Sequence, residues 1–357
     1  MIDSPLLPLE RLLLERSKVQ SEQPFLQADL FTRYEACLSF LRANIYPSID
    51  AGLAALSQED GIFTLHGPDH FDEVVRYAGL LLNVQDDVTV NLSAYEIFAL
   101  LVAIRIHDAG NMYGREHHER RAYQILASMG SAVFKDQFEI RNIAGIAGAH
   151  GGVTPDGSKD TISQLRERET YGVVELRPRL IAAVVRFADE ICENRTRAAE
   201  VLLDTNSLPA HNEVFHKYAS VIKSVVPEPK ERRVRIAYDL FVEDVLRKWG
   251  KGKINSSVQK VYLLEEIFSR LEKMFREREY CRRFMREVCD IEHVNATIEI
   301  HETPTTEFWS PQESLVRRWA VRSELDGYPS GGISISRVLG VTGKSLAREL
   351  RNRKRNK

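Results

Sequence analysis

The sequence has few cysteines and no long apolar run. Its four cysteines, Cys37, Cys192, Cys281 and Cys289, are scattered and form no Cys-x-x-Cys pair. This spacing favours reduced thiols over a disulfide framework and supplies no thiolate zinc motif. No apolar stretch approaches the roughly 20 residues of a membrane-spanning helix, and the first residues lack the basic start of a signal peptide. We therefore expect a cytoplasmic protein that does not enter a membrane.

The chain also lacks a strong excess of charge of either sign. Its 49 Lys and Arg residues and 51 Asp and Glu residues give a net charge of −2. This balance argues against a protein that coats nucleic acid over its whole surface, although local basic patches are compatible with it. The length of 357 residues allows one large domain or two ordinary ones.

One stretch combines an apolar helix end with histidines and a carboxylate. Residues 98–106 are almost wholly apolar and are followed at once by His107 and Asp108. Adjacent side chains on a helix point about 100° apart, so a centre that both side chains reach, such as a metal ion, would explain the pair. Two glycines then break the helix, and we expect room for a substrate there. The next helix begins with His117 and His118.

Three further polar residues lie on apolar helices. His70 lies one turn before Val74 on a buried face, His150 precedes a Gly-Gly stop, and Asp189 lies within the apolar run of residues 178–192. Each has an ordinary explanation as a core histidine, a helix cap or an ion pair, for Asp189 with Arg195 or Arg197. Imidazole and carboxylate groups together suit a divalent ion such as Mn²⁺, Fe²⁺, Mg²⁺ or Zn²⁺. The candidate set comprises His70, His107, Asp108, His117, His150 and Asp189.

The fold class predicted is mainly α, a helical bundle with a small α+β extension. Residues 232–240 and 294–301 alternate at period two and predict strands, and residues 258–288 predict a long amphipathic helix between them. Residues 153–170 are polar and predict either a lid or a solvated insertion. The domains expected are an N-terminal helical segment (1–58), a metal-site domain (59–210), the extension (211–302), and a linker with a basic C-terminal segment (303–357).

The C-terminal segment contains a pattern from Val338 to Leu346 that resembles half of a helix-turn-helix. Because only one helical unit is visible, the pattern gives little support for DNA recognition. Residues 351–357 are expected to form a frayed basic tail.

Residues 60–200 resemble the HD superfamily of metal-dependent phosphohydrolases. The resemblance rests on His70-x-x-x-Val74 with Ala78, on the His107-Asp108-Ala-Gly doublet after an apolar helix, and on Val-Arg-Phe-Ala-Asp189. It implies an HD-type helical domain in which His70, His107, Asp108 and Asp189 are the four metal ligands.

The resemblance leaves the number of ions open. His117 and His150 fall where members with two metal ions place two more histidines, but His150-Gly departs from their His-His-Glu. In triphosphohydrolase-type members, histidines after the doublet act on phosphate instead, which would place His117 or His118 in the site. The lead-in Thr64-Leu-His66-Gly and the region after residue 210 resemble the HD subgroup with a conserved extension. That subgroup is associated with prokaryotic stress and conflict systems, which suggests antiviral defence.

The function implied is hydrolysis of a nucleotide by a metal-activated water, with a (d)NTP, a cyclic nucleotide or a short oligonucleotide as substrate. Asp108 would ligate one ion or bridge two, and His117 or His118 would assist the leaving group. The candidate substrate contacts are His66, Arg115, Arg121, Arg186, Arg195 and Arg197. The alternatives are a non-catalytic nucleotide sensor or interaction module, and a single-strand nuclease. The sequence does not decide between a monomer and a homo-oligomer.

Overall fold

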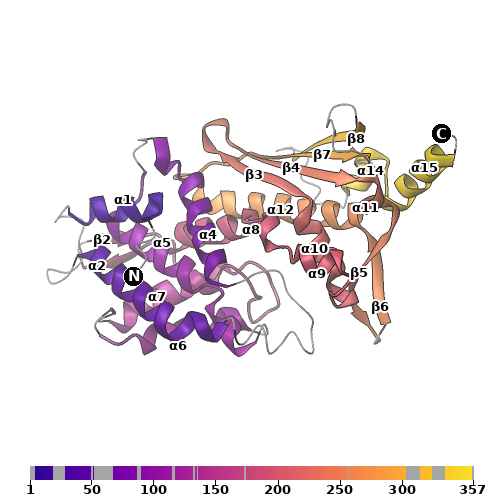
Figure 1. The fold of residues 1–357 in the computed structure, drawn as a ribbon. Coiled ribbons are helices and arrows are strands. Elements are labelled where there is room, and N and C mark those ends of the chain that lie inside the picture. The colour runs from indigo at the N-terminus through magenta and orange to yellow at the C-terminus, as the bar shows by residue number, and fades with distance from the viewer. Residues whose placement is uncertain are drawn as a thin grey trace. The chain divides into compact units, whose positions relative to one another are not determined.

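The computed structural model describes residues 5–18, 29–49, 51, 67–86, 90–114, 117–131, 133–134, 136–172, 174–255, 257–302, 314–323 and 334–355. Two of the predicted substrate contacts, His66 and Arg115, lie outside the described residues. The chain forms two compact units, one from residues 1–57, 66–192 and 280–290, the other from residues 58–65, 193–279 and 291–357. The structure is mainly helical with smaller sheets, as predicted (Figure 1). Among the described helices, none has both the length and the apolar character that crossing a membrane requires.

The first unit is built around one fully buried helix, α5 (Ala94–Ile106). A helix that is apolar on every side must be surrounded by others, and α5 packs against α1, α2, α4, α7 and α8. Its start is fixed by the capping box of Ser93 and Glu96. The surrounding helices are α1 (Pro8–Arg16), α2 (Leu30–Phe40) with a π-helical turn (Leu41–Ile45), α4 (Pro68–Leu81), α6 (Ala122–Ser128), α7 (Gln137–Gly148) and α8 (Pro178–Ile191). Short 3₁₀ turns cover Val84–Asp86, Ala109–Tyr113 (η4), His118–Arg121 (η5) and Ile162–Gln164.

A buried polar cluster fixes the last turn of α5. Arg105 is 2% exposed; its Nη2 lies 2.8 Å from Oε1 of Glu10 on α1, and its Nε donates to the Tyr34 hydroxyl at 2.9 Å. Tyr34 in turn donates to Glu10 at 2.5 Å, and Asp72 on α4 also pairs with Arg105. Since Arg105 precedes His107 by two residues, this cluster sets the position of the helix end that carries the His-Asp pair.

The segment that was expected to be a lid or a solvated insertion is anchored in its second half. The Tyr280 hydroxyl donates to Asp160 at 2.7 Å, and Arg186 donates to the Thr161 hydroxyl at 3.0 Å. Thr161 donates to the carbonyl of Ala149 at 2.7 Å. Residues 155–159 form an exposed turn before this anchor, and a small hairpin of β1 (Glu169–Tyr171) and β2 (Val174–Leu176) follows it.

The second unit contains a four-stranded sheet in the order β3-β4-β7-β8. The central strands β4 (Arg233–Phe241) and β7 (His293–His301) are parallel, and the outer pairs are antiparallel. Alternate residues of β4 and β7 are buried, as period-two strands with one covered face require. Both strands lie where the sequence predicts them. The outer strands are β3 (Ile222–Glu228) and β8 (Leu315–Arg322).

Three expectations for this unit were wrong in detail. The long helix α12 begins at Leu263 and ends at Met285, because Val258 and Val261 belong to strand β6 (Ser257–Tyr262), which pairs with β5 (Lys248–Ile254). Strand β8 lies within the stretch that was predicted to be a linker. The tail that was expected to be frayed is helical as far as Arg355.

The other helices of this unit are short, apart from the last. They are η7 (Arg195–Arg197), α9 (Glu200–Asp204), η8 (Ala210–Asn212), α10 (Glu213–Ser220), η9 (Pro229–Glu231), α11 (Val242–Leu246), α14 (Ile335–Leu339) and α15 (Gly343–Arg355).

Candidate metal centre

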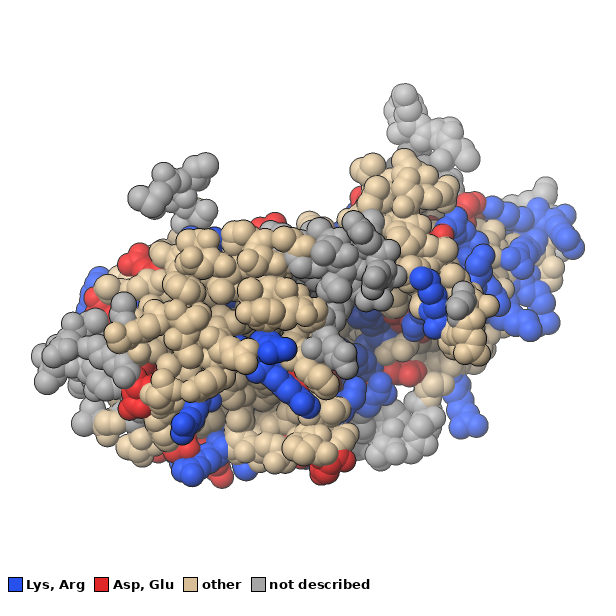
Figure 2. Space-filling model, turned by 90° about the horizontal axis from the view of Figure 1, so that it is seen from below, with Lys and Arg blue, Asp and Glu red and all other residues tan. Residues whose placement is uncertain are grey.

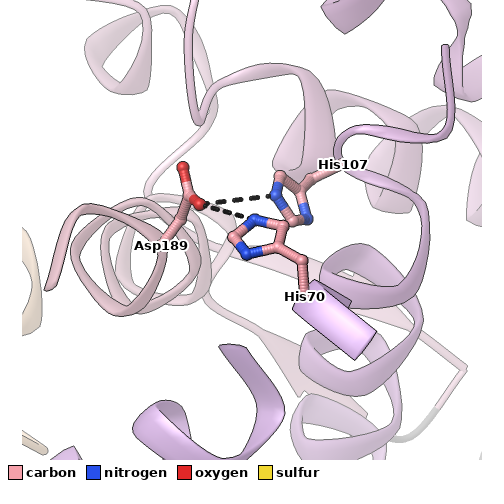
Figure 3. Close-up of side chains that lie close together, drawn as sticks. All are labelled: His70, His107 and Asp189. Atoms are coloured by element: carbon pink, nitrogen blue, oxygen red, sulfur yellow. Dashed lines mark ion pairs between the residues drawn. The ribbon is translucent and has the colours of Figure 1, made fainter. Parts of the chain in front are cut away.

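Three of the predicted ligands converge from three helices. Pro68 begins α4 and places His70 in its first turn, His107 caps α5, and Asp189 lies near the end of α8. Nε2 of His70 lies 3.1 Å from Oδ1 of Asp189, and Nε2 of His107 lies 3.6 Å from the same oxygen. Figure 3 shows both rings directed at this carboxylate. The sequence separations between these residues are large, so the tertiary fold creates the cluster.

The electrostatics of this cluster favour positive charge at its centre. Burial alone lowers the pKa of His107, but the carboxylates of Asp108 and Asp189 outweigh burial and raise it to about 9. Burial likewise opposes ionisation of Asp189, but His107 and His70 hold its pKa well below the usual range. Carboxylates that draw protons onto neighbouring imidazoles also attract a cation to the same place.

Asp108 lies between two groups of histidines. Its Oδ2 lies 3.8 Å from Nε2 of His107, whereas its Oδ1 lies 2.9 Å from Nε2 of His118 and 3.4 Å from Nε2 of His150. The carboxylate therefore faces the His70–His107–Asp189 group with one oxygen and a second pair of imidazoles with the other. Two sets of ligand atoms, His70–His107–Asp189 and His107–Asp108–His150, each lie within 4.8 Å of one another.

Backbone carbonyls determine which ring nitrogen of His107 and of His150 is available to bind a metal ion. Nδ1 of His107 lies 2.8 Å from the carbonyl of Ile104, and Nδ1 of His150 lies 2.6 Å from that of Ala147. A carbonyl only accepts, so in each neutral ring Nδ1 carries the proton and Nε2 has the lone pair. This arrangement is typical of metal-binding histidines, whose second nitrogen donates to a carbonyl or carboxylate. The donor set therefore fits a divalent ion.

In the structure His118 contacts Asp108, whereas the side chain of His117 faces solvent beside Glu119. His117 has φ of 57°, and its side chain is 55% exposed and 3.7 Å from Glu119. The left-handed backbone at His117 turns the chain so that the next residue, His118, points inward. Glu119 was not recognised from the sequence. Its side chain is 10% exposed, and Oε2 lies 3.7 Å from Nδ1 of His118, within ion-pair distance of that ring. Its position directly after the two histidines in the sequence was the signal that could have identified it.

Glycines allow the His118 turn to approach the helix ends. A Cβ on Gly110 would lie 2.1 Å from the carbonyl oxygen of His118, and one on Gly148 would lie 2.9 Å from that of Glu119. Gly152, with φ of 71°, gives room to the Glu119 carboxylate. The space beside Gly110 is thus filled by the backbone of His118, whereas a Cβ on Gly114 would meet nothing within 4 Å.

The predicted arginine contacts have different surroundings. Arg186 is buried; it bonds Thr161 and the Lys159 carbonyl, and its guanidinium lies 4.6 Å from the Tyr280 ring. Arg121 is exposed and lies over the Tyr113 ring at 5.3 Å.

Arg195 and Arg197 belong to the second unit. Arg195 pairs with Glu200 at 2.5 Å and Arg197 with Glu193 at 3.6 Å. Asp189 pairs with His70 and His107.

Comparison with protein-family models gives one match, HD-CE, over residues 61–273. Comparisons with curated proteins and with solved structures gave no match. The matched region takes in the candidate ligands from His70 to Asp189 and continues well into the second unit, which fits an HD-type domain with an extension. It covers more than half of the chain. The protein therefore belongs to the HD-CE family and contains an HD-type domain.

Proposed function

We propose that this protein is a metal-dependent phosphohydrolase that acts on a nucleotide. The observation that supports the proposal is the position of Asp108, whose two oxygens face two groups of imidazoles. An ion that acts in catalysis keeps a coordination position for water or substrate. The side chains of Asp189 and His118 are 29% and 18% exposed, so solvent reaches this cluster.

We assign the ligands to two ions that share Asp108. His70, His107 and Asp189 would hold the first ion together with Oδ2 of Asp108, and His118 and His150 would hold the second with Oδ1. His107 cannot serve both ions, because its Nδ1 is bound to the Ile104 carbonyl and only Nε2 is available. When bound, the ions would lower the pKa of a water molecule and neutralise phosphate charge.

The remaining residues orient the ligands or meet the substrate. Glu119 would hold the His118 ring through Nδ1. Exposed His117, next to this ligand, is the candidate for protonating the leaving oxygen. Arg121 is the candidate for binding phosphate, because its guanidinium is exposed in the turn that carries His118. We assign Arg186 a positioning role, since its bonds to residues 159 and 161 hold the loop that follows His150.

The test is turnover by the purified protein with bound Mn²⁺, Fe²⁺, Mg²⁺ or Zn²⁺. The panels would contain NTPs, dNTPs, cyclic nucleotides, and short linear and cyclic oligonucleotides. We expect hydrolysis of at least one class and its loss in Asp108→Asn, with metal content measured in both proteins. If the metal-loaded protein hydrolyses none of them, the proposal is wrong. A nucleotide that then raises the melting temperature would identify a non-catalytic sensor.

A further inference from the structure

Helix α15 presents a row of cations on one face. Lys344, Arg348, Arg351 and Arg355 are spaced by four, three and four residues, which places them along one stripe of an α-helix, and all are exposed. The helix has six basic residues and one acidic residue, Glu349, and so carries a charge of +5, although the whole chain carries −2. Figure 2 shows blue side chains gathered at the right, where Figure 1 has α15.

Most of this charge has no counter-ion within the described residues. Glu349 is paired with Arg317, and Glu243 is paired with Lys354. Arg351 donates to the carbonyl of Leu246 at 2.5 Å and keeps its full charge. In the described part of the chain, no ion pair involves the remaining cations of this helix, which are Lys344, Arg348, Arg353 and Arg355. An unneutralised row of cations attracts a polyanion.

The opposite face of α15 is packed into the second unit. Leu346, Ala347 and Leu350 are buried. At the start of the helix, the amide of Gly343 donates to Glu265 at 2.8 Å, and a Cβ on Gly343 would lie 2.4 Å from that of Tyr262. The helix is therefore held in a fixed position. Because its apolar face is used within the protein, it cannot insert into a lipid surface as an amphipathic membrane helix does.

The element before α15 completes a two-helix motif. Helix α14 ends at Leu339, the next residue Gly340 turns the chain with a φ of 64°, and α15 begins at Gly343. Thr342 and Ser345 cap the second helix reciprocally: the Ser345 amide donates to the Thr342 hydroxyl at 3.1 Å, and the Thr342 amide donates to the Ser345 hydroxyl at 2.9 Å. Two helices joined by a short glycine-containing turn have the connectivity of a helix-turn-helix, here with a first helix of five residues.

We propose that the cationic stripe of α15 binds the phosphate backbone of duplex DNA. A helix fits the major groove of B-DNA, whereas the major groove of duplex RNA is too narrow for side-chain access. Single-strand binding relies on aromatic side chains that stack on bases, and neither α14 nor α15 contains an aromatic residue. Binding rests on phosphate contacts and is therefore largely independent of sequence. This activity does not depend on hydrolysis at the metal centre.

The test compares two triple variants with the same change in net charge. Lys344→Gln/Arg348→Gln/Arg355→Gln removes three cations of the stripe, and Arg11→Gln/Arg76→Gln/Arg141→Gln removes three exposed cations of the first unit. Fluorescence anisotropy with a labelled 25-base-pair DNA duplex would be measured over a range of salt concentrations. The slope of log K against log salt is negative, and each lost phosphate contact makes it less steep by ~0.9. The slope of the stripe variant should therefore be less steep than that of the wild type by ~2.7.

The control variant should keep the wild-type slope, and both variants should keep the wild-type metal content. Absence of salt-dependent duplex binding by the wild-type protein overturns the proposal. So does an equal loss in the control variant, or tighter binding to duplex RNA, to single strands or to anionic vesicles. Because metal content and nucleotide turnover are measured separately, failure here is distinguishable from failure of the proposed hydrolase.

Discussion

Replacing Gly110 with alanine should remove the second ion and leave the first. The new methyl group would lie 2.1 Å from the carbonyl oxygen of His118 and 2.8 Å from its carbonyl carbon. Ordinary contact begins near 3.4 Å, so the turn that carries His118 must retreat by more than about 1 Å. The backbone of Gly110 is not left-handed, so alanine meets no conformational penalty there. The strain is steric and should destabilise the fold by about 1–3 kcal/mol.

The displacement acts directly on the second group of ligands. Nε2 of His118 lies 2.9 Å from Oδ1 of Asp108, and a retreat of 1 Å takes it out of reach of an ion held by that oxygen. A misplacement of this size costs about 100-fold in rate. The three atoms nearest to the new methyl group belong to His118 and Arg121, so the His70–His107–Asp189 group should keep its ion. Elemental analysis and turnover measure the two effects separately.

Gly151→Ala is the matched control. A Cβ on Gly151 meets nothing within 4 Å, and this glycine also lacks a left-handed backbone. It should therefore keep wild-type metal content and rate. If Gly110→Ala binds as much metal and turns over as fast as Gly151→Ala, the assignment of His118 to the second ion is refuted.

Three further predictions follow from the same geometry. His107→Ala should abolish metal binding and turnover together. If the variant retains both, the assignment of the metal site is wrong. Glu10→Ala removes the buried one of the two carboxylates that pair with Arg105 and should cost about 3–5 kcal/mol in urea denaturation, whereas Glu10→Gln keeps an acceptor and should cost less. In metal-free protein the folded-state pKa of His107 is raised to about 9. The stability that protonated His107 adds to the fold is therefore fully present below pH ~6.5 and is lost as the pH rises through 9. Melting curves with chelator should show this loss, and His107→Gln should not.

The helical core and the identity of most candidate ligands could be predicted from the sequence. His70, His107 and Asp189 interrupt apolar helix faces, and such interruptions need a partner wherever the helices pack. The choice between His117 and His118 could not be predicted in this way. It depends on the left-handed backbone of His117 and on the close approach of the His118 carbonyl to Gly110, which only the packed chain determines.

The elements that were missed share a polar exterior. Strand β8 is an edge strand in which arginines occupy both faces, so its alternation is obscured. Strand β6 exposes Gln259 and Lys260, and among the described strands its one partner is β5. Its valines also fit the period of the helix that follows. The end of α15 has no apolar residue after Leu350. These last residues are helical because they extend the buried first turns of α15, and apolar periodicity cannot detect such an extension.

The two proposed ions should differ in how firmly they are held. Around the first, His70 and His107 are buried, and both rings lie within 3.6 Å of Oδ1 of Asp189, so the ligands are ordered before the ion arrives. Around the second, the turn of His118 is held by contacts with glycines and has no buried side chain of its own. The free-energy cost of ordering that turn weakens binding of the second ion. Because the Asp108 carboxylate would bind both ions, the first ion would hold that carboxylate in the orientation that the second ion needs. The first group would therefore load before the second, and the glycine contacts at residues 110, 148 and 152 would determine whether the second position forms.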